Sequence, residues 1–342
     1  MKLRPLFILL AALTLSATVR SAPGTLIPRP QEATRLDGQF VFTTGIPVVY
    51  ASGLEPLAEY IADYIPLQRL DDRTWTAGAA LRLSLDGTMD DESYRLTVTP
   101  QGVQVVGADY GGVFNGLQTL LQLLPPEVYT GQATLPLAVD ACRIEDAPRF
   151  HYRGMMLDVV RTWMDADRVK RHIDLLSHLK INKLHLLLSN DEGWRLEIKS
   201  HPELTEIGAW RGGDSPVMPV YGKWDEKYGG FYTQDEMRDL IRYAAVRNVE
   251  IIPELDLPGH SRNFARVHPE ILCDYTPDLR PTAGYDYRSV WCASREENYR
   301  LLADILGELA ALFQIGRASC RERVEISGAG RSFRHQQSAG AL

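Results

Sequence analysis

The sequence predicts an α/β protein built from a small α/β domain and a second domain in which parallel strands alternate with helices. Two observations lead to this prediction. Between residue 25 and about residue 140, short stretches alternate apolar and polar side chains, and one amphipathic stretch follows them. From about Pro148 onward, apolar runs and amphipathic runs follow one another in turn, as parallel strands and their crossover helices do.

The composition is that of ordinary globular domains. The chain has 342 residues, of which 45% are hydrophobic and 24% are charged, so it is long enough for two domains and shows no bias toward disorder. Its net charge of −7 argues against a nucleic-acid partner.

Residues 1–21 have the pattern of a secretory signal peptide. Lys2 and Arg4 precede the apolar run LFILLAALTL, and small residues follow it. The apolar run is too short to span a bilayer as a permanent helix. We therefore expect an exported protein, periplasmic or extracellular, with no stable membrane insertion after the signal is cleaved.

Residues 22–146 are expected to form the small α/β domain. The segments LRLSL, YRLTVTP and GVQVVGA alternate apolar and polar residues as half-buried strands do. The run GVFNGLQTLLQLL then places Phe114, Leu117 and Leu121 at helical spacing, and Pro125 ends the predicted helix. This domain shows no constellation of catalytic residues.

Residues 147–313 carry the alternating pattern. The segments MMLDVV, KLHLLLS and VEIIPELD are predicted to be strands. The amphipathic runs that begin near Asp165, Thr233 and Ser294 are predicted to be helices. Asp165 and Thr233 are expected to cap the first two, and Ser294 and Glu297 have the spacing of a capping box.

Polar or ionisable side chains lie at the end of each of these predicted strands. The end of the first strand offers Asp158 and Arg161, that of the second Asn190, Asp191 and Glu192, and that of the third Glu254, Asp256 and His260. Because functional residues gather where parallel strands end, these side chains predict a pocket for a polar ligand.

The four cysteines are Cys142, Cys273, Cys292 and Cys320, and none has metal-ligand spacing. No cluster of histidines and acids has such spacing in the sequence either, so we expect no metal and no cofactor. Cys273 and Cys292 flank one long loop and, in an exported protein, form either a disulfide or two free buried thiols.

The residues at the strand ends resemble those of the β-N-acetylhexosaminidases of glycoside hydrolase family 20. Arg153, Gly154, Asp158 and Arg161 match the family pattern R-G-x-x-x-D-x-x-R, and Ile252 to His260 match I-P-E-x-D-x-P-G-H in full. The pattern N-x-L-H-x-H-L-S/T-D-D-x-G-W-R is matched at Asn182, Leu184, His185, Leu188, Ser189, Asp191, Gly193, Trp194 and Arg195. The resemblance covers about residues 24–313.

The resemblance implies a fold and an activity. The second domain would be the first part, about three strands, of a truncated TIM (β/α)8 barrel. The activity would be the release of terminal N-acetylglucosamine or N-acetylgalactosamine from glycans by an exo-acting, substrate-assisted retaining hydrolysis. Arg161 would hold sugar hydroxyls, with Asp158 as its alternative partner in a purely structural salt bridge. Asp256 and His260 would lie beneath the sugar and support the catalytic carboxylates.

Two positions depart from the family pattern. The chain has Leu187 where the family has a second histidine and Asn190 where it has the first of two aspartates. Because asparagine carries no charge, we expect any network that pairs this position with His260 to be electrostatically weaker. Asp191 and Glu192 are expected to keep the local role.

The resemblance places the catalytic Asp-Glu pair after a fourth strand, and residues 314–342 contain no such pair and no strand pattern. They hold five arginines against two glutamates, and IGRASCRERV reads as a translated sequencing adapter. We therefore expect 314–342 to be a non-native tail, the chain to be an N-terminal fragment, and the chain as written to be inactive. The alternative is a non-catalytic carbohydrate-binding relative that kept Arg161, Asp256 and His260.

Overall fold

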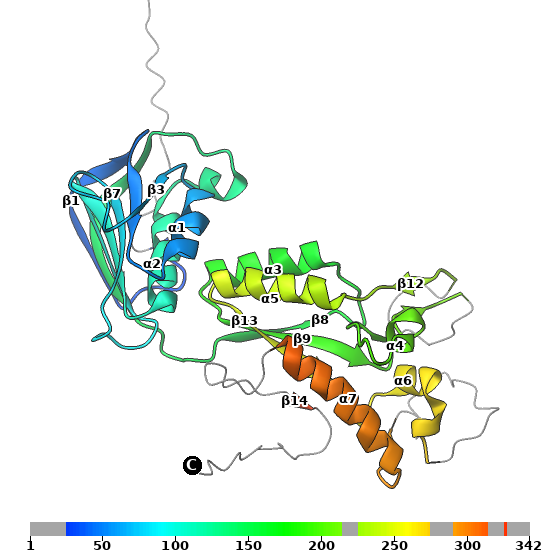
Figure 1. Cartoon of the computed structure of the whole chain (residues 1–342). Coiled ribbons are helices and arrows are strands. Elements are labelled where there is room, and N and C mark those ends of the chain that lie inside the picture. The colour runs from blue at the N-terminus through cyan, green and yellow to red at the C-terminus, as the bar shows by residue number, and fades with distance from the viewer. Residues whose placement is uncertain (1–24, 214–224, 274–289, 314–324, 327–342) are drawn as a thin grey trace, which may run out of the picture. The chain divides into compact units, whose positions relative to one another are not determined.

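The computed structural model describes residues 25–213, 225–273, 290–313 and 325–326 (Figure 1). The chain divides into two compact units, residues 1–147 and 148–342. The predicted signal peptide lies outside the described residues, as does all of the predicted tail except Glu325 and Ile326. In the described part of the chain, none of the helices combines the length and the apolar character needed to cross a membrane.

The first unit is built on a seven-stranded mixed sheet with the strand order β1-β7-β5-β6-β4-β2-β3. The strands are β1 (Glu32–Phe42), β2 (Pro47–Tyr50), β3 (Gln68–Asp71), β4 (Leu81–Leu85), β5 (Tyr94–Thr99), β6 (Gly102–Gly107) and β7 (Leu137–Asp146). The helices are α1 (Glu55–Ala62), α2 (Tyr110–Leu123) and the 3-10 turn η2 (Pro126–Thr130). Both α-helices lie along one face of the sheet (Figure 1). The predicted strands LRLSL, YRLTVTP and GVQVVGA form β4, β5 and β6.

Helix α2 forms where the apolar spacing predicts it. The Asp109 side chain caps its start by accepting a hydrogen bond from the Gly112 backbone at 2.8 Å. Gly116 lets the helix approach the sheet, because a Cβ at this position would lie 2.5 Å from Cγ1 of Val105 on β6. The helix ends at Leu123, and Leu124 is extended before Pro125.

The second unit contains a sheet in which β8 (Gly154–Asp158), β9 (Lys183–Asn190) and β13 (Glu250–Leu255) run parallel. The longer helices are α3 (Ala166–His178), α5 (Gln234–Val246) and α7 (Glu296–Leu312). The shorter elements are β10 (Gly193–Trp194), α4 (Glu203–Glu206), β11 (Trp210–Arg211), β12 (Tyr228–Gly229), α6 (Arg262–Val267), η3 (Pro269–Ile271) and β14 (Glu325–Ile326). The predicted order of strand, helix, strand, helix, strand is confirmed. The unit has the beginning of a (β/α) barrel.

Two details of the second unit differ from the prediction. Residues 314–342 were expected to have no strand pattern, but Glu325 and Ile326 form β14 and pair in parallel with Glu254 and Leu255. Side-chain alternation cannot reveal a pairing of two residues, because such a pairing depends on backbone groups at a strand edge. The predicted capping box at Ser294 is also wrong: α7 is preceded by Arg295 and has no side-chain cap, and Ser294 Oγ lies 3.2 Å from Cys292 Sγ.

The helices α3 and α5 lie side by side over the sheet (Figure 1). Asp165 caps α3, and Thr233 forms a capping box with Glu236 at the start of α5. The two helices are joined by Asp174 on α3, which accepts hydrogen bonds from Tyr243 on α5 and from Arg247 directly after it. Caps and cross-helix contacts therefore fix the layer that supports the strands.

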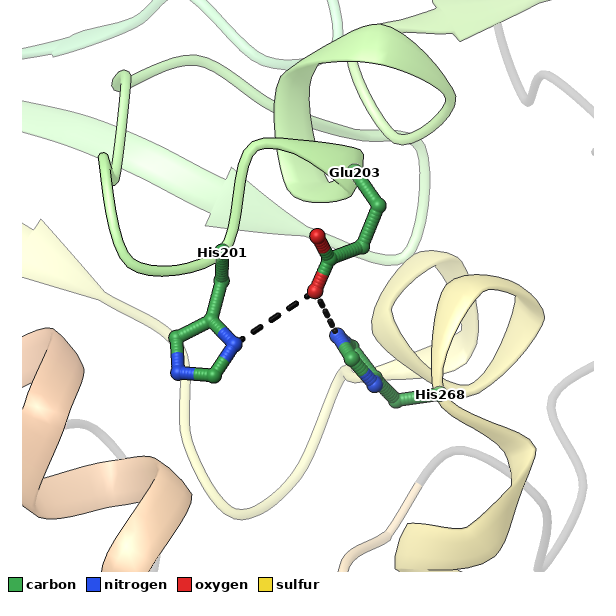
Figure 2. Close-up of side chains that lie close together, drawn as sticks. All are labelled: His201, Glu203 and His268. Atoms are coloured by element: carbon green, nitrogen blue, oxygen red, sulfur yellow. Dashed lines mark ion pairs between the residues drawn. The ribbon is translucent and has the colours of Figure 1, made fainter.

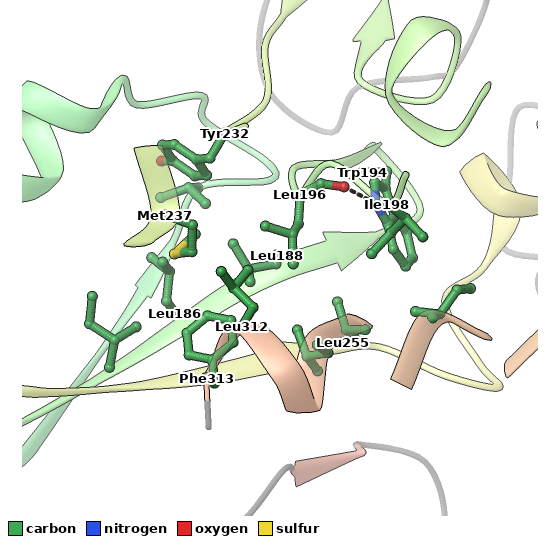
Figure 3. Packing of buried hydrophobic residues seen from close by; sticks show 14 of the residues in the cluster. Leu186, Leu188, Trp194, Leu196, Ile198, Tyr232, Met237, Leu255, Leu312 and Phe313 are labelled. Atoms are coloured by element: carbon green, nitrogen blue, oxygen red, sulfur yellow. Dashed lines mark hydrogen bonds between the residues drawn. The ribbon is translucent and has the colours of Figure 1, made fainter. Parts of the chain in front are cut away.

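A continuous apolar core lies between the strands and these helices. Figure 3 shows Leu186 and Leu188 of β9 beside Met237 of α5 and Leu312 of α7, and all four are buried. Trp194 is also buried in this core, and its indole nitrogen donates to the Leu196 carbonyl at 2.6 Å. This packing holds the carboxyl ends of β8, β9 and β13 in fixed positions.

Candidate active site

The residues predicted to form the pocket converge at the carboxyl ends of the three parallel strands. We call the following set the strand-end cluster: Asp158, Arg161, Asn190, Asp191, Glu192, Asp256 and His260. Asp158 is the last residue of β8, Asn190 is the last residue of β9, and Asp256 directly follows β13. Hydrogen bonds and ion pairs connect the members across all three strand ends.

Arg161 is anchored from two neighbouring strand ends. Its Nη1 donates to Asp158 Oδ2 at 2.6 Å, and its Nη2 donates to Asn190 Oδ1 at 3.2 Å. Its Nε lies 3.7 Å from Glu192 Oε1. The side chain is still 29% exposed, so the guanidinium is oriented and also accessible. The salt bridge to Asp158 that the sequence left as an alternative is therefore present, together with further contacts.

Two buried arginines fix the turn that carries Arg161. Arg195 donates to the carbonyls of Val159 and Val160 at 3.1 and 2.6 Å. Arg211 donates to the carbonyls of Val160 and Arg161 at 3.3 and 2.7 Å. Burial, and next the nearby Arg211, lower the pKa of Arg195 to about 10. The sequence named Arg195 only as a motif match and did not predict Arg211, because hydrogen bonds to carbonyls leave no pattern in side chains.

Asp256 is buried beside Asn190 and has a shifted pKa. Asn190 Nδ2 donates to Asp256 Oδ2 at 2.5 Å, and the two side chains belong to residues that are only 3% and 7% exposed. Burial, and then the charge of Glu254, raise the pKa of Asp256 to about 6, while His260 and Arg161 oppose the shift. This carboxyl group therefore changes charge near pH 6.

The Asp256 shift predicts a pH-dependent effect of Asp256→Asn. Because the folded pKa of about 6 exceeds the ordinary 3.8, the folded state binds more protons between these values and loses stability as pH rises. The asparagine variant lacks this loss, so it should be more stable than the parent by about 1–3 kcal/mol at pH 7 and nearly equal to it at pH 4. Urea denaturation at both pH values measures the difference.

A matched control is Asp225→Asn, which changes an exposed carboxylate of the same unit. It should leave the stability difference from the parent unchanged between the two pH values. A variant Asp256→Asn that is less stable than the parent at pH 7 would contradict the raised pKa.

His260 pairs with Asp191 rather than with position 190. His260 Nδ1 lies 3.0 Å from Asp191 Oδ2, and Asp191 Oδ1 accepts from the backbone of Arg262 at 3.0 Å. The expected weakening concerned a network between position 190 and His260. The amide of Asn190 instead bonds Asp256 and Arg161, and Asp191 gives His260 a carboxylate partner. His260 itself is half exposed, so a buried carboxylate orients an accessible imidazole.

Glu192 is a buried acid of the strand-end cluster, and its carboxyl group lies near Arg161. The residue is 3% exposed, and burial raises the pKa of its carboxyl above the ordinary value even though Arg161 acts to lower it. Its Oε2 makes no hydrogen bond within the described residues. Glu192 thus adds a buried acceptor to the wall of the cluster.

A second pair of an acid and an imidazole lies within the strands β9 and β13, before their carboxyl ends. His185 Nε2 of β9 is 2.6 Å from Glu254 Oε2 of β13. The sequence placed Glu254 among the strand-end residues but gave His185 only as a motif match. The sequence could have indicated which face of β9 carries His185, because side chains two residues apart point to the same face of a strand.

The disulfide left open by the sequence is formed. Cys273 and Cys292 are bonded and enclose a loop whose residues 274–289 lie outside the described part of the chain. Cys142, by contrast, is a free buried thiol in the first unit.

The fold and the strand-end cluster define the class of (β/α)-barrel enzymes, whose functional residues lie at the carboxyl ends of barrel strands. The model of the glycosyl hydrolase family 20 catalytic domain matches residues 150–324, and the model of glycosyl hydrolase family 20 domain 2 matches residues 24–147. The chain belongs to glycosyl hydrolase family 20, as the resemblance predicted. The match to residue 324 includes part of the segment that the sequence set apart as a tail.

Known proteins of this family resemble the chain in sequence and in fold. A β-hexosaminidase of Vibrio furnissii is 40% identical over 294 residues, which are 84% of this chain and 47% of that protein. The exo-β-N-acetylglucosaminidase of Vibrio harveyi in complex with N-acetylglucosamine has a TM-score of 0.76 and 34% identity, over 86% of this chain and 46% of that one. The β-N-acetylhexosaminidase of Streptomyces coelicolor has a TM-score of 0.74 and 33% identity, over 86% and 58%. The chain spans about half the length of the curated relative from V. furnissii.

Proposed function

We propose that the chain carries part of the sugar site of an exo-acting β-N-acetylhexosaminidase, which releases terminal N-acetylglucosamine or N-acetylgalactosamine from glycans. One observation carries the proposal: Arg161 is anchored by Asp158 and Asn190 yet accessible, beside the buried Asp256. The complex of the V. harveyi relative with N-acetylglucosamine supports the ligand class.

Each group in the cluster has a role that fits such a substrate. The planar guanidinium of Arg161 donates directed hydrogen bonds that match a pair of sugar hydroxyls. The pair of Asp191 and His260 supplies an imidazole whose orientation is fixed by the buried carboxylate. Asn190 donates a hydrogen bond to Asp256 and thereby fixes the position of this buried carboxyl group. These residues bind and orient the substrate, while the proposed substrate-assisted hydrolysis uses a separate acid.

The chain as written is expected to release no measurable product from a chromogenic N-acetyl-β-glucosaminide. The proposed reaction needs an acid that protonates the leaving oxygen and an adjacent aspartate that orients the acetamido group, and we assign this pair to no residue of the chain. The measurement is absorbance of the freed phenolate with purified chain. Turnover that disappears in Glu192→Gln would contradict this proposal, because it would make Asp191 and Glu192 the catalytic pair.

The second candidate is a non-catalytic carbohydrate-binding relative. It is favoured by Leu187 and Asn190, which replace the histidine and aspartate of the family pattern. The gene read past the codon for Phe313 separates the two candidates. An Asp-Glu pair with downstream tryptophan and tyrosine residues, together with turnover by the encoded protein, supports the hydrolase. Their absence, with retained binding of N-acetylglucosamine, supports the binder.

We also propose that the protein is exported to the periplasm or the extracellular space. The pattern of residues 1–21 supports this, and the disulfide between Cys273 and Cys292 is of the kind that persists in oxidising compartments. Fractionation of expressing cells, followed by N-terminal sequencing, tests it. Cytoplasmic protein that keeps Met1 would contradict export.

A further inference from the structure

A second group of ionisable side chains converges outside the strand-end cluster. His201 lies just before α4, Glu203 is the first residue of α4, and His268 directly follows α6 (Figure 2). His268 Nε2 is 2.9 Å from Glu203 Oε1, and His201 Nδ1 is 3.4 Å from the same oxygen. One potential ligand atom from each residue lies within 4.8 Å of the other two.

These separations suit a small divalent cation. Zinc binds imidazole nitrogen and carboxylate oxygen at about 2.0–2.2 Å, so ligand atoms around a tetrahedral ion are roughly 3.3–3.6 Å apart. The distances from Glu203 Oε1 to the two imidazole nitrogens, 2.9 and 3.4 Å, lie close to this range. The ligand atoms of the two histidines lie within 4.8 Å of each other and would move closer together around an ion. The three side chains are 19%, 32% and 15% exposed, so an ion can enter and keep water as a further ligand.

Both imidazoles are supported from behind by a second carboxylate. His201 Nε2 lies 3.3 Å from Asp304 Oδ2 of α7, and His268 Nδ1 lies 2.9 Å from Glu270 Oε1 of η3. Carboxylates that bind the remote nitrogen of a histidine fix its tautomer and orient the other nitrogen toward a metal. The two histidines therefore have the outer contacts that metal-binding histidines have.

One nitrogen on the inner side of the group lacks a hydrogen bond. His268 Nε2 is buried and makes no aligned hydrogen bond among the described residues, although Glu203 Oε1 lies 2.9 Å from it. His201 Nδ1 lies near the same carboxylate oxygen. A carboxylate oxygen and two imidazole nitrogens, one of them buried without a hydrogen bond, thus lie close together.

We propose that His201, Glu203 and His268 bind one divalent transition-metal ion, with zinc as the expected occupant. Two imidazoles and a carboxylate form a ligand set that suits zinc. The ion would join α4 to the end of α6, the helix that follows His260 and whose first residue, Arg262, bonds Asp191. The site would stabilise the segment beside the strand-end cluster and take no part in the sugar chemistry. The sequence predicted no metal because His268 is remote from the other two ligands.

Zinc binding by the purified, disulfide-bonded chain tests the proposal. After equilibration with zinc chloride and removal of free metal, elemental analysis should find close to one ion per chain, and zinc should raise the melting temperature by mass action. Glu203→Gln keeps the shape of the side chain and should weaken zinc binding by about 100-fold, while Asp304→Asn, which alters only an outer contact, should weaken it about 10-fold.

Two controls separate this site from other histidines. His172→Ala removes a partly exposed imidazole of α3, and His260→Ala removes the imidazole of the strand-end cluster. Both should bind zinc like the parent. The proposal is overturned if the parent chain retains no zinc and melts at the same temperature with and without it. It is equally overturned if Glu203→Gln and His201→Ala bind as tightly as the parent, or if His260→Ala abolishes binding.

Discussion

Replacing Arg195 with methionine is expected to lower the free energy of unfolding of the second unit by about 3–5 kcal/mol. The Arg195 guanidinium is fully buried and donates to four backbone carbonyls, those of Val159, Val160, Ala209 and Gly230, at 2.5–3.1 Å. Methionine fills the space but leaves these carbonyls without their donor, and each buried unsatisfied group costs about 1–3 kcal/mol. The surrounding structure can relax and offer some of these carbonyls other partners. The expected loss of stability is therefore smaller than the sum over four unsatisfied carbonyls.

Urea denaturation followed by tryptophan fluorescence measures this loss, since Trp163 and Trp194 lie in the same unit. The matched control is Arg171→Met, which changes an exposed arginine on α3 and should stay within about 0.5 kcal/mol of the parent. Equal unfolding midpoints for the two variants would show that Arg195 does not hold the strand ends.

Replacing Arg161 with lysine is expected to have the largest effect on activity. In a full-length family 20 protein that contains residues 24–313 of this chain, kcat/KM for an N-acetyl-β-glucosaminide should fall about 100-fold to 1,000-fold. Lysine keeps the charge but cannot reproduce the fixed plane that Asp158 and Asn190 orient. The loss therefore measures directed hydrogen bonding rather than charge.

The control for this variant is Arg168→Lys, because Arg168 forms an exposed ion pair with Asp165 on the helix surface. It should leave kcat/KM unchanged. If Arg161→Lys also retains kcat/KM within about twofold, the directed role of the guanidinium is wrong.

Apolar spacing and capping residues correctly predicted several strands and helices, because these elements depend mainly on residues near one another in the sequence. The spacing of apolar residues located β4, β5, β6 and α2, and Asp165 and Thr233 act as the predicted caps. Ser294 does not, because its hydroxyl lies beside Cys292 Sγ near the disulfide. The failure occurs where a contact from another part of the loop competes with the helix terminus.

The strand-end cluster could be located from the sequence, but its pairings could not. Parallel strands bring their carboxyl ends together whatever the side chains do, so Asp158, Asn190 and Asp256 were placed at one edge. Which atom bonds which depends on backbone direction after each strand. The sequence could therefore only say that a network between position 190 and His260 would be weak, and it did not predict that Asp191 is a partner of His260.

The group of His201, Glu203 and His268 shows the same limit more strongly. Its ligands come from a loop, a helix start and a helix end, and only the packing of α4 against α6 brings them together. The supporting role of Arg195 and Arg211 was not predicted for a related reason, because their partners are backbone carbonyls. Contacts of this kind leave no spacing in the sequence.

The most direct measurement is a crystal structure, with bound N-acetylglucosamine, of a full-length family 20 protein that contains residues 24–313 of this chain. We predict that sugar hydroxyl oxygens accept hydrogen bonds from Arg161, with Asp256 and His260 on the same side of the ring. A sugar bound elsewhere, with the strand-end cluster unoccupied, would contradict the assignment of this cluster as the hexosamine site.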